Sequence, residues 1–254
     1  MRFGSIKGLS GWFFLKILQV VKDFFLGRGR KTTTKDNFES LIRKNRQRIE
    51  LVTFEDFCRK SNINPDREDI AIKYPPLLVS KAVLLSLYSE IYALCSLAKK
   101  IKAKNVFEIG TFEGKTSANI ANNLEEGAVI HTLDFPLYKH LIDKESVGRY
   151  IKEDPKASAI VKIIESDSLL FDFSPFYNKI DIMYIDGGTS YRCVFSDSEN
   201  ALKCVKRGGF ILWHDFLAIG KCYEGLVAAV FDFALKHDLK LYLLDGTRLV
   251  VTQV

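Results

Sequence analysis

The sequence predicts an α/β fold with a seven-stranded, mostly parallel sheet that helices cover on both faces. From Asn105 onward, short apolar runs alternate with helical patterns, which is typical of a parallel sheet. The strand runs are almost continuously apolar, as in strands that are buried on both faces. Only Asp245-Gly246-Thr247 joins the last two runs. This connection is too short for a crossover helix, so we expect a C-terminal antiparallel hairpin.

The residues in front of this region are predicted to form an N-terminal helical extension. We place the extension at residues 1–75 and the sheet domain at residues 76–254. The run GWFFLKILQVVKDFFLG, residues 11–27, has polar residues at helical spacing and a broad apolar face, which indicates an amphipathic helix. Residues 27–37 are polar and basic, and we interpret them as a linker.

Helices and strands are expected in a regular order along the rest of the chain. Helical patterns run from about Phe38 to Cys58 and, after the stop at Pro75-Pro76, from Leu77 to Lys102. The strands are expected at residues 105–109, 128–134, 159–167, 180–186, 209–215, 239–246 and 247–254. The helices between them are expected at residues 115–124, 138–153, 195–206 and 223–236.

The net charge of +6 comes from the N-terminal arm. Residues 1–35 contain eight Lys or Arg and one Asp, a net +7, so the remaining residues sum to about −1 and give no reason to expect nucleic acid as a partner. Two interpretations of the helix within residues 1–30 stay open. It lies on a membrane surface as a peripheral contact, or it docks on the protein's own core or on a second subunit of a homo-oligomer. The five widely spaced cysteines include no C-x-x-C pair, which favours free thiols in a cytoplasmic compartment.

The stretch EIGTFEGKTS, Glu108–Ser117, raises the question of which ligand its glycine turn holds. A P-loop needs four residues between its first glycine and Gly-Lys-Thr, so that backbone N–H groups surround a phosphate. Only three residues separate Gly110 from Gly114. Glu113 would also bring a carboxylate into the anion site. A P-loop-like phosphotransferase therefore stays as an alternative interpretation.

A nucleoside ligand with a positively charged tail accounts for more of these residues than the phosphate of a P-loop does. Gly110 lets the backbone approach a ligand closely, and the carboxylate of Glu108 beside it favours a positively charged group. Asp134 ends the second strand, 24 positions after Gly110, where a carboxylate commonly binds a ribose diol. Ser166-Asp167 ends the third strand, in reach of an adenine edge. Together these positions predict a nucleoside that carries an amino-acid tail.

Five motifs in this order resemble the class I S-adenosylmethionine-dependent methyltransferases, and most of all the small O-methyltransferases of the catechol and macrolide-sugar types. The motifs are FEIGTFEGKTS, HTLDF, ESDS, MYIDGGTSY and VKRGGFILWHDF. The resemblance covers about residues 77–254 and implies a Rossmann-like fold. It also implies an enzyme that transfers a methyl group from S-adenosyl-L-methionine to a hydroxyl of a sugar or another small molecule.

The resemblance implies a cofactor site made of three groups of residues. The methionine part would be bordered by Glu108, Gly110 and Gly114, with Thr116 near its carboxylate. The ribose hydroxyls would be held by Asp134. The adenine would face Ser166 and Asp167.

The catalytic end is expected at the tips of the fourth and fifth strands, where ligands bind in open α/β sheets. The resemblance places Asp186, His214 and Asp215 there. The two carboxylates could hold Mg²⁺, which would lower the pKa of an acceptor hydroxyl, and His214, a poor ligand for so hard an ion, could act as the general base. Related enzymes often read Asp-Gly-Asp-His-Ser-Tyr after the fourth strand, whereas Gly188-Thr189 stands here in place of the second Asp and the His. A non-catalytic cofactor-binding or membrane-associated protein is therefore a further alternative.

Overall fold

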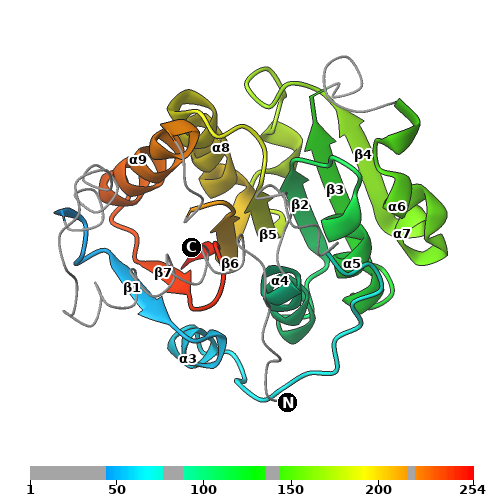
Figure 1. The fold of residues 1–254 in the computed structure, drawn as a ribbon, viewed down its shortest axis with the longest axis horizontal. Helices are drawn as coiled ribbons and strands as arrows, with labels where there is room; N and C mark the ends of the chain where they lie inside the picture. The colour runs from blue at the N-terminus through cyan, green and yellow to red at the C-terminus, as the bar shows by residue number, and fades with distance from the viewer. Residues whose placement is uncertain (1–43, 77–87, 136–143, 217–220) are drawn as a thin grey trace, which may run out of the picture.

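The computed structural model describes residues 44–76, 88–135, 144–216 and 221–254 (Figure 1). The predicted amphipathic segment and linker lie outside the described residues, as do the first part of the helix expected from Leu77 and part of the helix expected at 138–153. Within the described ranges, no helix combines the length and the apolar character that crossing a membrane requires.

Eight strands form a single sheet. They are β1 (Ile49–Val52), β2 (Asn105–Ile109), β3 (Val129–Asp134), β4 (Val161–Glu165), β5 (Ile180–Ile185), β6 (Val205–Trp213), β7 (Leu241–Leu244) and β8 (Val250–Gln253). Their order across the sheet is β1-β7-β8-β6-β5-β2-β3-β4. Strand β8 runs antiparallel to both of its neighbours, β6 and β7, while the other pairs are parallel. The predicted mostly parallel sheet with an antiparallel hairpin is confirmed.

Helices lie on both faces of this sheet. They are α3 (Phe54–Lys60), α4 (Tyr88–Lys100), α5 (Lys115–Asn123), α6 (Arg149–Glu153), α7 (Pro155–Ile160), α8 (Tyr191–Cys204) and α9 (Lys221–Lys236), with 3-10 turns at Lys144–Ser146 and Ser174–Phe176. Local capping fixes several helix starts. The hydroxyl of Ser190 accepts a hydrogen bond from Cys193 N at the start of α8, so this helix begins four residues before the predicted start.

Alternate residues of the central strands pack into two separate hydrophobic clusters. In β5, Met183 and Ile185 contact the cluster that includes α8 and α9, while Ile182 and Tyr184 contact the cluster that includes α4 and α5. Every residue of β5 is buried. This burial on both faces explains why the strand is almost continuously apolar in the sequence, with Asp181 as the exception.

Strand β1 corrects the predicted helix from about Phe38 to Cys58. Residues 49–52 pair with β7 in parallel at the edge of the sheet, and α3 begins only at Phe54. The side chain of Thr53 caps α3 by accepting a hydrogen bond from Asp56 N, which sets the start of that helix. Pairing with the sheet and burial of Ile49 and Val52 outweigh the helical propensity of the neighbouring residues. The sheet thus has eight strands instead of seven.

The carboxyl ends of four neighbouring strands are tied together at one edge of the sheet. Each link is a backbone hydrogen bond made by the residue that follows a strand. Gly110 N donates to Leu133 O at 2.7 Å, Asp186 N to Ile109 O at 2.8 Å and His214 N to Ile185 O at 3.0 Å. The residues that follow β2, β3, β5 and β6 are therefore held close together. This is the edge at which ligands bind in open α/β sheets.

Candidate active site

Gly110 forms the turn between β2 and α5 at a position that only glycine fits. Its φ is +111°, and a Cβ atom there would lie 2.2 Å from the carbonyl oxygen of Asp186. The amides of the loop already have acceptors: Phe112 N donates to Asp134 Oδ2 and Gly114 N donates to Thr111 O, both at 2.7 Å. Because these two N–H groups are used inside the protein, they do not bind a phosphate as the amides of a P-loop do.

A cavity of about 250 Å³ opens at the carboxyl ends of β2, β3 and β5. Three of the predicted cofactor residues line it, namely Gly110, Asp134 and Asp167. The rest of its wall is formed by Ile109, Leu133, Phe135, Ser168, Leu169, Gly187, Gly188 and Cys193. A mainly apolar cavity with a few carboxylates at separate strand ends is typical of a small-molecule site.

Glu108 lies in the interior, away from the wall of this cavity. Its side chain is 1% exposed, and its Oε2 accepts hydrogen bonds from Ser117 Oγ and Thr132 Oγ1, both at 2.6 Å. Burial, opposed by these two hydrogen bonds, raises the pKa of Glu108 to about 8. The carboxyl group therefore joins β2, β3 and α5 from inside and is largely protonated at neutral pH.

The remaining predicted cofactor residues also lie outside the lining of the cavity. Gly114 begins α5 with φ +78°, where a Cβ would lie 2.5 Å from Ile151 Cδ1. Thr116 is buried in the first turn of that helix. Ser166 follows β4, and its hydroxyl is directed to Asp167 O at 3.5 Å. The structure thus brings together a subset of the predicted set around one cavity.

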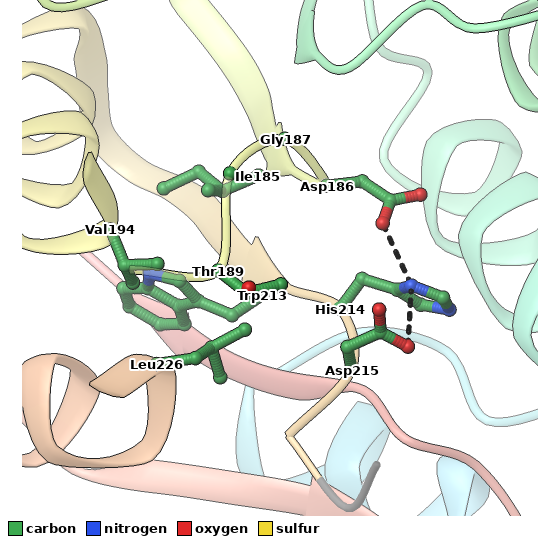
Figure 2. Close-up of a pocket in the computed structure, with 10 residues that line it drawn as sticks. Ile185, Asp186, Gly187, Thr189, Val194, Trp213, His214, Asp215 and Leu226 are labelled. Atoms are coloured by element: carbon green, nitrogen blue, oxygen red, sulfur yellow. Dashed lines mark ion pairs between the residues drawn. The ribbon is translucent and has the colours of Figure 1, made fainter. Parts of the chain in front are cut away.

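Asp186, His214 and Asp215 come together at the tips of β5 and β6 (Figure 2). His214 Nδ1 lies 2.8 Å from Asp186 Oδ1 and 3.3 Å from Asp215 Oδ1. The three side chains also line a cavity of about 10 Å³, which has room for about one water molecule. Gly187 and Gly188 belong to the walls of both cavities. The polar group of three residues therefore adjoins the larger cavity.

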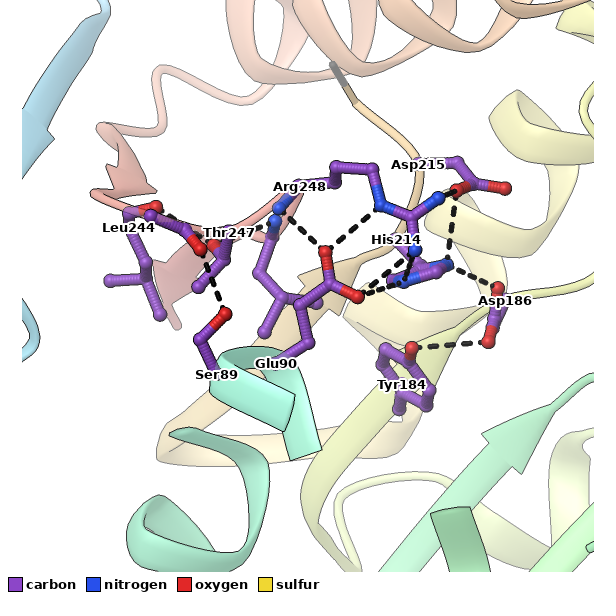
Figure 3. A network of polar contacts seen from close by, with 11 residues as sticks. Ser89, Glu90, Tyr184, Asp186, His214, Asp215, Leu244, Thr247 and Arg248 are labelled. Carbon is purple, nitrogen blue, oxygen red and sulfur yellow. Dashed lines mark hydrogen bonds and ion pairs between the residues drawn. The ribbon is translucent and has the colours of Figure 1, made fainter. Parts of the chain in front are cut away.

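A buried network surrounds His214 on its other side, and sequence reasoning missed its two key members, Glu90 and Arg248 (Figure 3). His214 Nε2 lies 2.9 Å from Glu90 Oε2. Arg248 donates to both Glu90 oxygens, each at 3.0 Å, and to Asp215 Oδ1 at 2.7 Å. Glu90 interrupts an apolar helical run and Arg248 lies in the final hairpin. These are weak signals, because nothing local shows that residues 158 positions apart meet.

Charges dominate the protonation of this network. Burial disfavours the imidazolium, yet the carboxylates of Asp186 and Glu90 outweigh it and raise the pKa of His214 well above its usual value. Burial also favours a neutral Glu90, but His214 and Arg248 hold the pKa of Glu90 well below its usual range. With a proton on its ring and 2% exposure, His214 is poorly suited to act as a general base toward an acceptor.

The donor set at the strand tips fits a divalent cation. Asp186, His214 and Asp215 each offer one ligand atom, and all three atoms lie within 4.8 Å of one another. His214 Nδ1 is buried and, although two carboxylate oxygens are near it, it has no hydrogen-bond partner of suitable geometry. Carboxylate oxygens and imidazole nitrogens are common protein ligands of divalent metals.

Comparison with known proteins identifies the class of domain. Residues 107–216 match the family described as "Methyltransferase domain". This match runs from β2 through Asp215 and includes the glycine turn and the three residues at the strand tips. Residues 107–216 are therefore similar to a methyltransferase domain, and the predicted resemblance to the class I methyltransferases is confirmed. No curated protein sequence matches the chain significantly.

Solved structures share this fold at low sequence identity. The O-methyltransferase from Bacillus cereus in complex with SAH is 13% identical, with a TM-score of 0.51 over 94% of this chain and 100% of that one. The SAH-bound methyltransferase PaMTH1 from Podospora anserina is 14% identical, with a TM-score of 0.51 over 99% of both chains. The O-methyltransferase TomG from Streptomyces achromogenes, in complex with SAM, is 14% identical, with a TM-score of 0.50 over 88% and 99%. The likeness is one of fold.

Proposed function

We propose that this protein transfers a methyl group from S-adenosyl-L-methionine to a hydroxyl of a sugar or another small molecule. The observation that carries the proposal is the cavity of about 250 Å³ that Gly110, Asp134 and Asp167 line. These residues follow three successive strands, at the edge where the methyltransferase domain is expected to bind its cofactor. SAH or SAM in the structural neighbours supports the same ligand class.

The cofactor would lie with its ribose at Asp134 and its adenine toward Asp167 and Ser166. Asp134 Oδ2 already accepts a hydrogen bond from Phe112 N, which holds the carboxylate at the rim of the cavity. The methionine part would then pass Gly110, with Gly114 and Thr116 in the helix behind it. Gly187 and Gly188 line both cavities, so the methyl end would lie toward the residues at the tips of β5 and β6.

Asp186, His214 and Asp215 would form the catalytic end. Methyl transfer is an in-line displacement, so the site mainly positions the acceptor hydroxyl and excludes water. A divalent cation, for which the sequence suggests Mg²⁺, would be held by Asp186 and Asp215 and would lower the pKa of that hydroxyl. Tyr184 OH donates to Asp186 Oδ2 at 3.1 Å and helps to orient this carboxylate. The cysteine pattern supports a cytoplasmic enzyme, and peripheral membrane contact through residues 1–30 stays a prediction.

The proposal is tested by calorimetry with SAH and with ATP on the wild type and on Asp134→Ala. We expect SAH to bind and ATP to give no binding. Loss of a charged hydrogen-bond acceptor for the ribose should weaken SAH binding about 10–100-fold. Asp69→Ala, at an exposed aspartate that does not line the cavity, is the matched control and should bind SAH as the wild type does. Binding of ATP without SAH would instead support the phosphotransferase alternative.

A further inference from the structure

We propose that His214 is a metal ligand held in place by Glu90, and that this imidazole makes the site select a transition-metal cation such as Mn²⁺ over Mg²⁺. The inference deepens the proposed function, because it specifies the cation class at the same catalytic end. It rests on the position of both ring nitrogens of His214 relative to three carboxylates.

The Nδ1 side of His214 has the geometry of a ligand in a site with Asp186 and Asp215. Two ligand atoms at right angles, each about 2.1 Å from a cation, lie about 3.0 Å apart. The distances from Nδ1 to the two carboxylate oxygens, 2.8 and 3.3 Å, bracket this value. Nδ1 makes a well-directed hydrogen bond with neither oxygen. The two oxygens therefore lie beside Nδ1, as neighbouring ligands around one cation do, and a bound cation takes the place of the Nδ1 proton.

The Nε2 side of His214 faces Glu90 and also Arg248, whose Nη2 lies 3.2 Å from Nε2. The carboxylate lies 2.9 Å from Nε2 and is completely buried. A metal-bound histidine almost always donates its other ring N–H to such a carboxylate or to a carbonyl, which fixes its tautomer and ring orientation. Arg248 donates to both oxygens of Glu90 and so fixes the carboxylate itself. Glu90 is therefore a positioning residue that leaves Nδ1 for the cation.

The ligand set decides which cation is favoured. Mg²⁺ prefers oxygen ligands in near-ideal octahedral geometry. An imidazole nitrogen instead suits Fe²⁺, Ni²⁺, Cu²⁺ and Zn²⁺, and in the usual order Mn²⁺ binds more weakly than these ions. Two carboxylates with one imidazole suit such cations better than they suit Mg²⁺.

Direct metal titration of the full chain without SAM or an acceptor tests this inference. The free Mn²⁺ signal in electron paramagnetic resonance measures Mn²⁺ affinity, and competition measures Mg²⁺ affinity. We expect the wild type to bind one Mn²⁺ about tenfold or more tightly than Mg²⁺. His214→Asn should reduce this preference about tenfold or more, and Glu90→Gln should weaken Mn²⁺ binding about tenfold. His237→Asn is the matched control, because His237 pairs with Glu199 at 2.6 Å outside the cluster, and it should change neither affinity.

A second measurement keeps the test independent of how well the variants fold. Electron spin echo modulation of Mn²⁺ bound to the wild type should show a directly coordinated nitrogen. Absence of nitrogen coupling, equal affinities for Mn²⁺ and Mg²⁺, or an unchanged preference in folded His214→Asn would each overturn the inference. Because no cofactor takes part, a failure of SAH to bind would refute the proposed function alone and would leave the metal result intact.

Discussion

At the scale of single residues, Gly110 is needed for two reasons: its φ is positive, and there is no space for a Cβ atom. Its φ lies in the region that favours glycine, and the space next to it is filled by the backbone of Asp186. Gly127 meets only the first requirement, because its φ is +80° but nothing lies within 4 Å of a Cβ built there. A comparison of alanine substitutions at Gly110 and Gly127 therefore distinguishes the effect of backbone strain from the effect of steric conflict.

Gly110→Ala should destabilise the protein more than Gly127→Ala and should abolish SAH binding. The strain of a positive φ alone is worth about 1–2 kcal/mol, which is the loss expected for Gly127→Ala. In Gly110→Ala, the new methyl group must also push apart the ends of β2 and β5. Thermal unfolding and calorimetry with SAH measure the two effects. Equal losses of stability and intact SAH binding in both variants would refute this explanation.

The same scale shows what sequence reasoning can find. Gly110, Asp134 and Asp167 were predictable as cavity residues, because a glycine turn and strand-end carboxylates have fixed places in a parallel sheet. The interior position of Glu108 was not predictable, because it depends on hydroxyls of α5 and β3 that reach it only in the folded chain. Strand-end position predicts which residues gather, and tertiary contacts decide which of them face the ligand.

At the scale of elements, the ion pair of Glu90 with Arg248 fastens helix α4 to the hairpin of β7 and β8. Both side chains are buried, and Arg248 also holds Asp215 at the tip of β6. Breaking a buried pair leaves an uncompensated charge, whereas replacing both partners removes the charge as a whole. The link should therefore show strong energetic coupling.

Arg248→Met should lower the free energy of unfolding by about 3–5 kcal/mol. The double variant Glu90→Gln with Arg248→Met should lose clearly less than the sum of the two single losses. Urea denaturation of the wild type, both single variants and the double variant completes the cycle. Arg48→Met, which breaks a more exposed pair with Asp238, should change stability by about 0.5 kcal/mol or less. Additive losses would contradict the coupling.

Strands with a clear run of apolar residues agree well with the prediction, whereas the edge strand β1 does not. The predicted strands at 105–109 and 180–186 agree almost to the residue with β2 and β5, because burial on both faces leaves a mostly apolar run. Strand β1 has only four residues, and the sequence pattern around it predicts a helix instead. Its pairing with β7 is a contact between residues nearly two hundred positions apart, so no local pattern reports it.

At the scale of the whole molecule, β1 and α3 pack on the same sheet as the methyltransferase domain. The ring of Phe57 is fully buried, and its centroid lies 5.8 Å from that of Phe210 and 5.7 Å from that of Tyr242. The boundary predicted at residues 75 and 76 stays a prediction. Whether residues 49–60 unfold together with the rest of the sheet can be measured directly.

Phe57→Ala should lower the stability of the whole domain by about 3–5 kcal/mol in one cooperative transition. The reason is that the cavity left by the ring lies between α3, β6 and β7. Far-UV circular dichroism and tryptophan fluorescence should give coincident urea curves. Leu235→Ala, at a 57% exposed position of α9, should have little effect. Separate transitions by the two probes would show that the segment before residue 76 folds on its own.

Strand β8 follows β7 in the chain but is inserted between β6 and β7 in the sheet. A nascent chain on the ribosome that has not yet delivered β8 leaves two unpaired strand edges facing each other. A chain that stops before Arg248 also lacks the guanidinium that pairs with the carboxylates of Glu90 and Asp215. Unpaired edges are sites of intermolecular association. A chain truncated before β8 should therefore expose two strand edges through which it can associate with other copies.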